Sequence, residues 1–129
     1  MAIVTTKQVV AQQSLVLQEA QVAYNIEVFG VNEGVSQALV RDMALDTNGY
    51  IWLATKDGLN RYDGVDFEVF RNILGVPNSL AESNVSRLLV DQGGTLWCQT
   101  NLNGIARFRP ETEDFENISV SNKLNSNAI

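Results

Sequence analysis

The sequence lacks the residues that most enzyme active sites and metal centres require. It contains no histidine in 129 residues, which excludes imidazole acid–base catalysis, Ser-His-Asp triads and most zinc sites. Cys98 is the single cysteine, so an internal disulfide and a cysteine-based metal site are excluded as well. We therefore expect no catalytic residue, no metal and no other cofactor.

Clustered positive charge and long apolar runs are also missing. The chain has 9 Lys and Arg against 15 Asp and Glu, a net charge of −6, with no basic run. Nucleic acids and anionic membranes attract clustered Lys and Arg, so we expect neither as a partner. No apolar stretch approaches the roughly 18 to 20 residues of a membrane span, so we expect no membrane insertion by this segment.

The first 23 residues show no strong pattern. They carry one lysine, with Val, Leu and Ala scattered among Gln and Thr. An intact signal peptide would show a continuous apolar centre after a basic start. We expect residues 1–23 to form a helical or disordered lead-in, and the clipped remainder of a longer export signal is an alternative.

An internal repeat organises the rest of the chain. Asp, Gly, Trp and Thr recur at one offset of 45 residues between 46–55 and 91–100, and a Gly-x-x-Arg-Tyr/Phe motif follows at an offset of 46. The matched residues are Asp46, Gly49, Trp52, Thr55, Gly58, Arg61 and Tyr62 in the first copy, and Asp91, Gly94, Trp97, Thr100, Gly104, Arg107 and Phe108 in the second.

Each copy contains four short strand-like runs, which with a period near 45 predicts a β-propeller blade. We name the strands A to D from the propeller axis outward; they are expected at 38–45, 50–55, 59–62 and 67–71, and again at 84–90, 95–100, 105–109 and 115–120. The predicted fold is all-β: an incomplete propeller of two four-stranded antiparallel sheets, the blades 35–72 and 80–120. An extra outer strand is expected at 24–30, where Ile26–Phe29 resembles Phe67–Phe70, and residues 121–129 form a tail or the start of a next blade.

Strand B is apolar on both faces in each copy, as Ile51–Ala54 shows. A half-exposed strand would alternate apolar with polar residues, so each sheet needs a neighbour on both sides. Two blades share only one interface, which leaves two apolar faces bare. We therefore expect further blades of the same chain or other copies of itself as partners, and a homo-oligomer if this is the whole chain.

The repeated residues have structural interpretations that we favour over functional ones. Matched tryptophans favour packing between blades over sugar stacking. Matched aspartates favour turn capping over calcium binding, because no further carboxylates stand at alternate positions. Matched arginines favour ion pairing or stacking between blades, and Cys98 is interpreted as a small core residue.

One rim of the blades is the candidate ligand site. The D-to-A and B-to-C connections emerge on this rim and carry small polar side chains that suit a glycan or a peptide. The alternative is that these are solvated loops. The candidate ligand-binding residues are Lys56, Asp57, Asn84, Asn101 and Asn103.

The stretch Asp46–Tyr62 resembles the two-component regulator propeller repeat, whose pattern is Asp-x-x-Gly-x-Leu-Trp-Ile-Gly-Thr followed by Gly-Leu-x-Arg-Tyr/Phe. The resemblance covers about residues 24–120, and it departs from the pattern at Leu53-Ala54 and Cys98-Gln99, where the family has Ile-Gly. In that family such repeats form N-terminal sensor propellers of hybrid histidine kinases and diguanylate cyclases. The resemblance implies a non-catalytic ligand-sensing or interaction module of a bacterial signalling receptor, in the periplasm.

Two other functions are weighed against this one. The chain could be a self-assembling propeller fragment with a purely structural role, which the bare sheet faces favour. A propeller-type hydrolase or lyase is the remote alternative, because histidine is absent and no acid pair converges on one rim.

Overall fold

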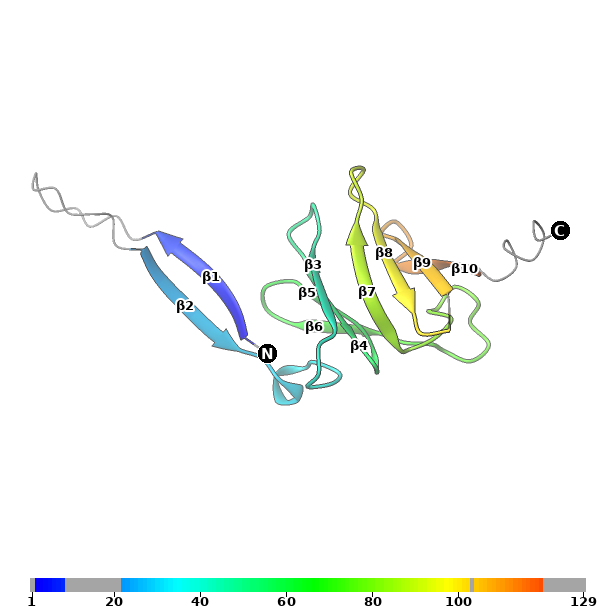
Figure 1. Ribbon diagram of the computed structural model, residues 1–129, viewed down its shortest axis with the longest axis horizontal. Coiled ribbons are helices and arrows are strands. Elements are labelled where there is room, and N and C mark those ends of the chain that lie inside the picture. The colour runs from blue at the N-terminus through cyan, green and yellow to red at the C-terminus, as the bar shows by residue number, and fades with distance from the viewer. Residues whose placement is uncertain (1, 9–21, 103, 120–129) are drawn as a thin grey trace, which may run out of the picture.

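The computed structural model describes residues 2–8, 22–102 and 104–119. Figure 1 shows two four-stranded sheets side by side and a two-stranded hairpin that extends away from them. The hairpin consists of β1 (Ala2–Gln8) and β2 (Val22–Val28), and a single turn of 3-10 helix, Val31–Glu33, follows it. No helix within these ranges is long and apolar enough to cross a membrane.

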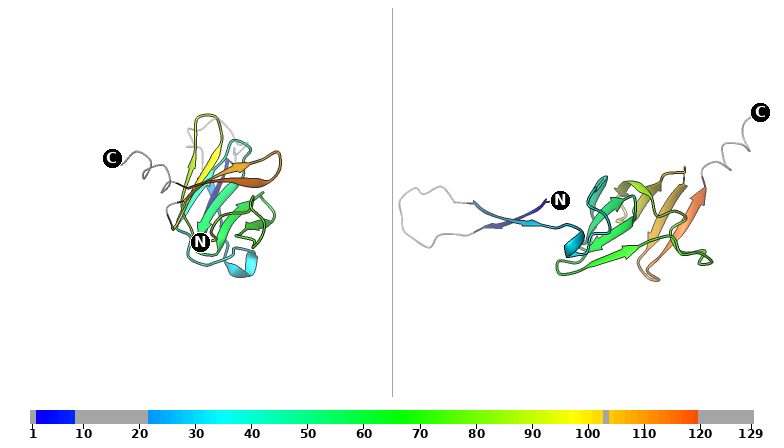
Figure 2. Two further views of the ribbon diagram at one scale, coloured as in Figure 1. Left: turned by 90° about the vertical axis from the view of Figure 1, so that its right-hand side faces the viewer. Right: turned by 90° about the horizontal axis from the view of Figure 1, so that it is seen from below.

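The two sheets are the predicted propeller blades. The first contains β3 (Asp42–Leu45), β4 (Ile51–Thr55), β5 (Gly58–Tyr62) and β6 (Phe67–Phe70), and the second contains β7 (Val85–Val90), β8 (Leu96–Thr100), β9 (Gly104–Arg109) and β10 (Asp114–Ser119). Each sheet is an antiparallel meander in sequence order. Figure 2 shows the two sheets from the side and from below, stacked as neighbouring blades. The predicted all-β propeller fold is confirmed.

The A-to-B turn of the first blade is built around Asp46. Its Oδ1 accepts hydrogen bonds from the backbone N–H groups of Asn48 at 2.8 Å and Tyr50 at 3.0 Å. Its Oδ2 accepts one from Trp52 Nε1 at 2.8 Å. Gly49 takes the positive φ of 88° that the turn requires. The carboxylate therefore ties the turn to the core tryptophan.

The second blade repeats this arrangement residue for residue. Asp91 Oδ1 accepts from the N–H groups of Gly93 and Thr95, both at 2.9 Å. Its Oδ2 accepts from Trp97 Nε1 at 2.9 Å. The predicted turn capping is confirmed, and the indole bond explains why tryptophan follows aspartate by six residues in both copies.

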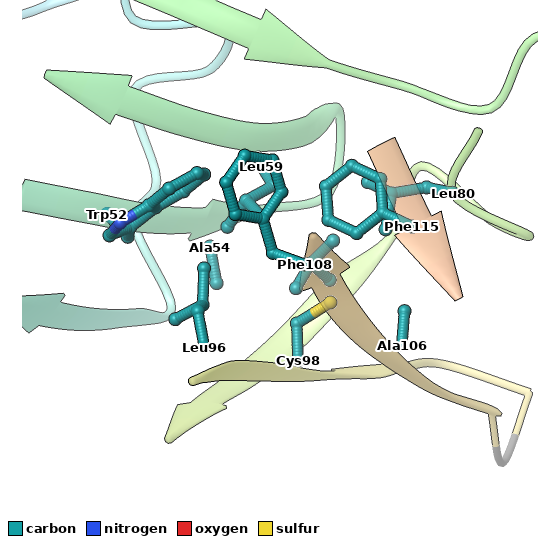
Figure 3. Close-up of a cluster of buried hydrophobic side chains, with 10 residues drawn as sticks. Trp52, Ala54, Leu59, Leu80, Leu96, Cys98, Ala106, Phe108 and Phe115 are labelled. Carbon is teal, nitrogen blue, oxygen red and sulfur yellow. The ribbon is translucent and has the colours of Figure 1, made fainter. Parts of the chain in front are cut away.

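Aromatic side chains fill the space between the blades (Figure 3). The Phe108 ring centroid lies 4.8 Å from that of Trp52, and the Phe70 ring lies 5.6 Å from both Phe108 and Phe115. Cys98 belongs to the same cluster, and burial raises the pKa of its thiol to about 12. The interpretation of Cys98 as a core residue is confirmed.

Strand A of the first blade is shorter than predicted, because it begins at Asp42 instead of residue 38. Polar groups of Ser36 and Gln37, which precede this strand, form hydrogen bonds with residues of other segments. Ser36 N–H donates to Asn60 Oδ1 at 2.8 Å, and Gln37 Oε1 accepts from the Lys56 N–H at 3.3 Å. These bonds hold the segment against the B and C strands, so it does not extend strand A.

The expectation of a helical or disordered lead-in is wrong for residues 2–8. They form β1, which pairs with β2 along its length from Ala2↔Val28 to Gln8↔Val22. The run Ile3–Thr6 is β-branched throughout, which favours a strand. The extra outer strand expected at 24–30 spans 22–28 and has β1 as its partner. Residues 9–21 and 121–129 lie outside the described residues, and the export signal stays a prediction.

Phe29 continues from β2 onto the outer face of the first blade. Its ring centroid lies 4.9 Å from that of Tyr62 and 5.5 Å from that of Phe67. In the interface between the blades, Phe70 packs in the same way against the counterparts Phe108 and Phe115. Phe29 thus occupies the place that strand D of a preceding blade would provide.

Candidate functional site

A backbone hydrogen bond joins the two blades at the candidate ligand rim. Gly58 N–H, in the B-to-C turn of the first blade, donates to the Ser83 carbonyl of the second at 2.6 Å. Within the second blade, Asn101 N–H, after strand β8, donates to the Asn84 carbonyl at 3.1 Å. The structure therefore brings Lys56, Asp57, Asn84 and Asn101 to one rim, while Asn103 lies outside the described residues.

Gly58 allows strands β5 and β6 of the first blade to lie close together at this rim. A Cβ at this position would lie 2.6 Å from the Phe70 carbonyl oxygen, and its φ is 111°. Both facts restrict the position to glycine. Glycine in the predicted Asp57-Gly58 turn is thus required by the close contact with Phe70 as well as by the backbone conformation of the turn.

Asp57 is held by an ion pair on this rim. Its two carboxylate oxygens accept hydrogen bonds from Arg71 Nε and Nη2, both at 3.0 Å. The hydrogen bond from Arg71 holds the pKa of the Asp57 carboxyl below its ordinary value. Asp57 remains half exposed, so a ligand can still reach its edge, but the carboxylate is already oriented by Arg71.

Asn84 and Lys56 present different groups to solvent. Asn84 Oδ1 accepts a hydrogen bond from Arg41 Nη1 at 2.6 Å, which fixes the orientation of its amide. The side chain of Lys56 is exposed, as is that of Asn101. The rim therefore offers oriented amides, an ammonium group and a paired carboxylate, which can hydrogen-bond a polar ligand. Within the described residues, no group of three or more acidic or cysteine side chains gathers to hold a metal.

A buried polar network beneath the rim was missed by the sequence analysis. Asn60 is fully buried, and its Nδ2 donates to Ser36 Oγ at 2.8 Å while its Oδ1 accepts from the Ser36 N–H. Thr55 Oγ1 lies 2.9 Å from Ser36 Oγ and donates to the Gly58 carbonyl. The available signal was Asn60 itself, because the second copy has Ala106 at that position in strand C.

Arg61 lies between the blades, as predicted. Its guanidinium carbon is 4.9 Å from the Tyr50 ring centroid and 5.6 Å from that of Trp52. It forms ion pairs with Glu68 of its own blade and with Glu113 of the next, the latter at 2.8 Å. The interpretation of Arg61 as an ion-pairing and stacking residue is confirmed.

A cleft of about 250 Å³ opens on the opposite rim, above Arg61. The A-to-B turns of both blades line it, together with Tyr50, Phe108 and Pro110. The Asp46 carboxylate in its wall is bonded to its own turn and to Trp52, and Arg61 is paired with two glutamates. The charged groups of this cleft therefore serve the blade interface.

Known proteins that are similar to this chain include the two described below, and no family model matches it. Histidine kinase P4 of Formosa agariphila is 45% identical over 40 residues, which is 31% of this chain and 3% of that protein. The crystal structure of the extracellular domain of the hybrid two-component system BT3049 from B. thetaiotaomicron superposes with a TM-score of 0.63 and 25% identity. That match covers 70% of this chain and 13% of the other.

These findings confirm the resemblance predicted from the repeat. The chain is similar in fold and sequence to part of the extracellular domain of a hybrid two-component system. It spans only a small share of the length of both proteins.

Proposed function

We propose that this chain is part of the extracytoplasmic sensor propeller of a bacterial signalling receptor and acts as a non-catalytic ligand-sensing or interaction module. The observation that carries the proposal is the structural match to an extracellular domain of a hybrid two-component system. The absence of histidine from the sequence supports a role without acid–base catalysis.

The ligand site of this module is the rim of Lys56, Asp57, Asn84 and Asn101, with Asn103 beside them in sequence. The backbone hydrogen bond from Gly58 to Ser83 and the side-chain bond from Arg41 to Asn84 hold the two blades together there, so a ligand that spans the rim contacts both blades. Amide groups and an ammonium group bind hydroxyl and carbonyl groups, which are the polar groups of glycans and peptides.

Thermal denaturation against a panel of glycans and peptides tests this proposal. A ligand that binds only the folded chain raises its stability by about 2.7 kcal/mol at a hundredfold excess over Kd. We expect at least one ligand to raise the Tm in a concentration-dependent way. The double variant Asn84→Ala, Asn101→Ala should lose this response.

Asn48→Ala is the matched control, because Asn48 is an exposed asparagine in the A-to-B turn of the opposite rim. It should keep the full response. A panel without any shift, or a shift that survives in the double variant, contradicts the proposed ligand site.

A second candidate function is self-assembly, which the exposed apolar side chains favour. Met43, Leu45 and Leu89 lie on the inner strands of the two blades and are 55–66% exposed. Such side chains promote association. Light scattering distinguishes self-assembly from ligand sensing. Self-assembly predicts a discrete closed oligomer, and a monomer at all concentrations would exclude this function.

A further inference from the structure

The first blade carries two basic residues at the ligand rim that the repeat does not require. These are Arg41 and Lys56, which we call the rim cations. At the same offset of 45 that relates the two copies, the second blade has Ser86 and Asn101. Since the second blade forms without a positive charge at either position, the rim cations are not needed to build a blade.

Both rim cations lie at one place on the rim. Asp42 pairs with Ala54 at the start of β3, and the Arg41 N–H donates to the Ala54 carbonyl at 2.8 Å. Lys56 comes directly after the end of β4. Paired strands are about 4.7–4.9 Å apart, so Arg41 and Lys56 stand at the ends of neighbouring strands, and both are exposed.

The carboxylates near the rim cations are already bonded elsewhere in the protein. Asp57 is held by its ion pair with an arginine of the same blade. Asp42 Oδ2 accepts a hydrogen bond from the Leu88 N–H at 2.8 Å. Glu82 Oε2 accepts one from the Leu102 N–H at 2.9 Å. The acceptors of this rim are therefore engaged in holding the fold.

The rim cations, in contrast, keep an unpaired charge. In the part of the chain that the structure describes, neither of them forms an ion pair with a carboxylate. Arg41 Nη1 donates to Asn84 Oδ1 at 2.6 Å across the two blades, which orients the guanidinium without neutralising it. A guanidinium has five N–H donors, so donors remain for a ligand, and the ligand that suits them is an anion.

We propose that Arg41 and Lys56 form a subsite for a carboxylate of the ligand, and that Arg41 is its specificity-determining residue. This inference rests on the proposed ligand-sensing function and adds a charge to the ligand that binds the rim. The planar guanidinium fits both oxygens of a carboxylate, and the ammonium group adds a second charge-assisted hydrogen bond. A uronic acid of a glycan and the carboxy terminus of a peptide both supply this group.

Ligands that differ only in charge test the proposal. Calorimetric titration of the full chain compares oligogalacturonate with its methyl ester, and N-acetyl-triglycine with its amide. We expect the acid of one pair to bind at least about tenfold more tightly than its neutral form, because hydrogen bonds to charged groups are the stronger ones. The pair that responds identifies the source of the carboxylate.

Variants assign the preference to the rim cations. The double variant Arg41→Ala, Lys56→Ala should bind the acid and its neutral form with equal affinity, whereas Arg41→Lys, which keeps the charge, should keep part of the preference. Arg87→Ala is the matched control, since it removes an exposed arginine from β7, and it should keep the full preference. If the unchanged chain binds a neutral form as tightly as its acid, the subsite is overturned while the ligand-sensing function stands.

Inorganic sulfate provides a probe that does not require an identified ligand. In an NMR titration at constant ionic strength, we expect a saturable shift of the Arg41 Nε–H signal and none of the Arg87 Nε–H signal. Equal responses of the two arginines, or no response of either, would overturn the subsite. A response of Arg41 to sulfate, without binding of any glycan or peptide, would support the subsite and contradict the ligand-sensing function.

Discussion

Asp46 and Asp91 each accept three hydrogen bonds, two from backbone N–H groups of the turn and one from an indole. A residue that combines turn capping with an anchor for the core side chain links local and tertiary structure. This double role explains why aspartate and tryptophan recur together although the residues between them differ in the two copies.

Replacing one of these aspartates should cost more than the loss of a surface charge. In Asp91→Ala, two backbone donors and the Trp97 indole lose their acceptor, and we expect the urea midpoint to fall clearly below that of the unchanged chain. Urea denaturation followed by tryptophan fluorescence measures this. Glu111→Ala removes an exposed carboxylate and should change stability by less than about 0.5 kcal/mol. An equal effect of both variants would contradict the anchoring role.

At the residue scale, several side-chain roles could be predicted from the sequence. The repeat indicated turn capping by the matched aspartates and ion pairing by Arg61, and the apolar surroundings of Cys98 indicated a core residue. Asn60 could not be predicted, because its partners Ser36 and Thr55 come from other segments and only the fold brings them together.

The strands themselves were predictable because turn residues separate them. Positive-φ glycines at 49, 58, 64 and 94 end the short apolar runs at the expected places. The lead-in was not predictable in the same way. The pairing of Ala2–Gln8 with Val22–Val28 joins segments with no turn signal that the sequence analysis recognised, so strand propensity alone was the available evidence.

The hairpin is attached to the blades through Phe29. The Phe29 ring packs on Tyr62 and Phe67 and is half buried. We expect Phe29→Ala to lower the free energy of unfolding by about 1–2 kcal/mol, less than the 3–5 kcal/mol of a fully buried phenylalanine. Chemical denaturation provides the measurement.

Tyr24→Ala is the control for Phe29→Ala, since Tyr24 lies on β2, the strand that leads to Phe29, and is 62% exposed. It should have an effect below about 0.5 kcal/mol. If Phe29→Ala were equally neutral, Phe29 would not hold the hairpin on the first blade.

Over the whole molecule, paired carboxylates make stability depend on acid pH. The pKa of Asp57 is lowered by the hydrogen bond from Arg71, that of Asp91 by the bond from Trp97, and that of Asp114 by the bond from Arg109. A group whose pKa is lower in the folded than in the unfolded state stabilises the fold at pH values above its unfolded pKa, here near 3.8. This stabilisation is lost as the pH falls through the folded pKa.

We therefore expect the urea midpoint to be constant from pH 7 to about 5 and to fall steadily below about pH 4. Asp57→Asn should reduce the size of this fall, because it removes one of the three groups. Asn48→Ala, which removes no titratable group from an exposed turn, should leave the pH profile unchanged. A midpoint that stays flat down to pH 2 would contradict the assignment.

Because Phe29 already stands where a preceding blade would place its own phenylalanine, the two ends of the stack are not equivalent. A neighbour that approached the first blade would first have to displace the Phe29 ring from Tyr62 and Phe67. One that approached the second blade would meet the half-buried side chains of Trp97, Ile105 and Arg107. The outer faces of the two blades therefore offer different surfaces to anything that stacks on them.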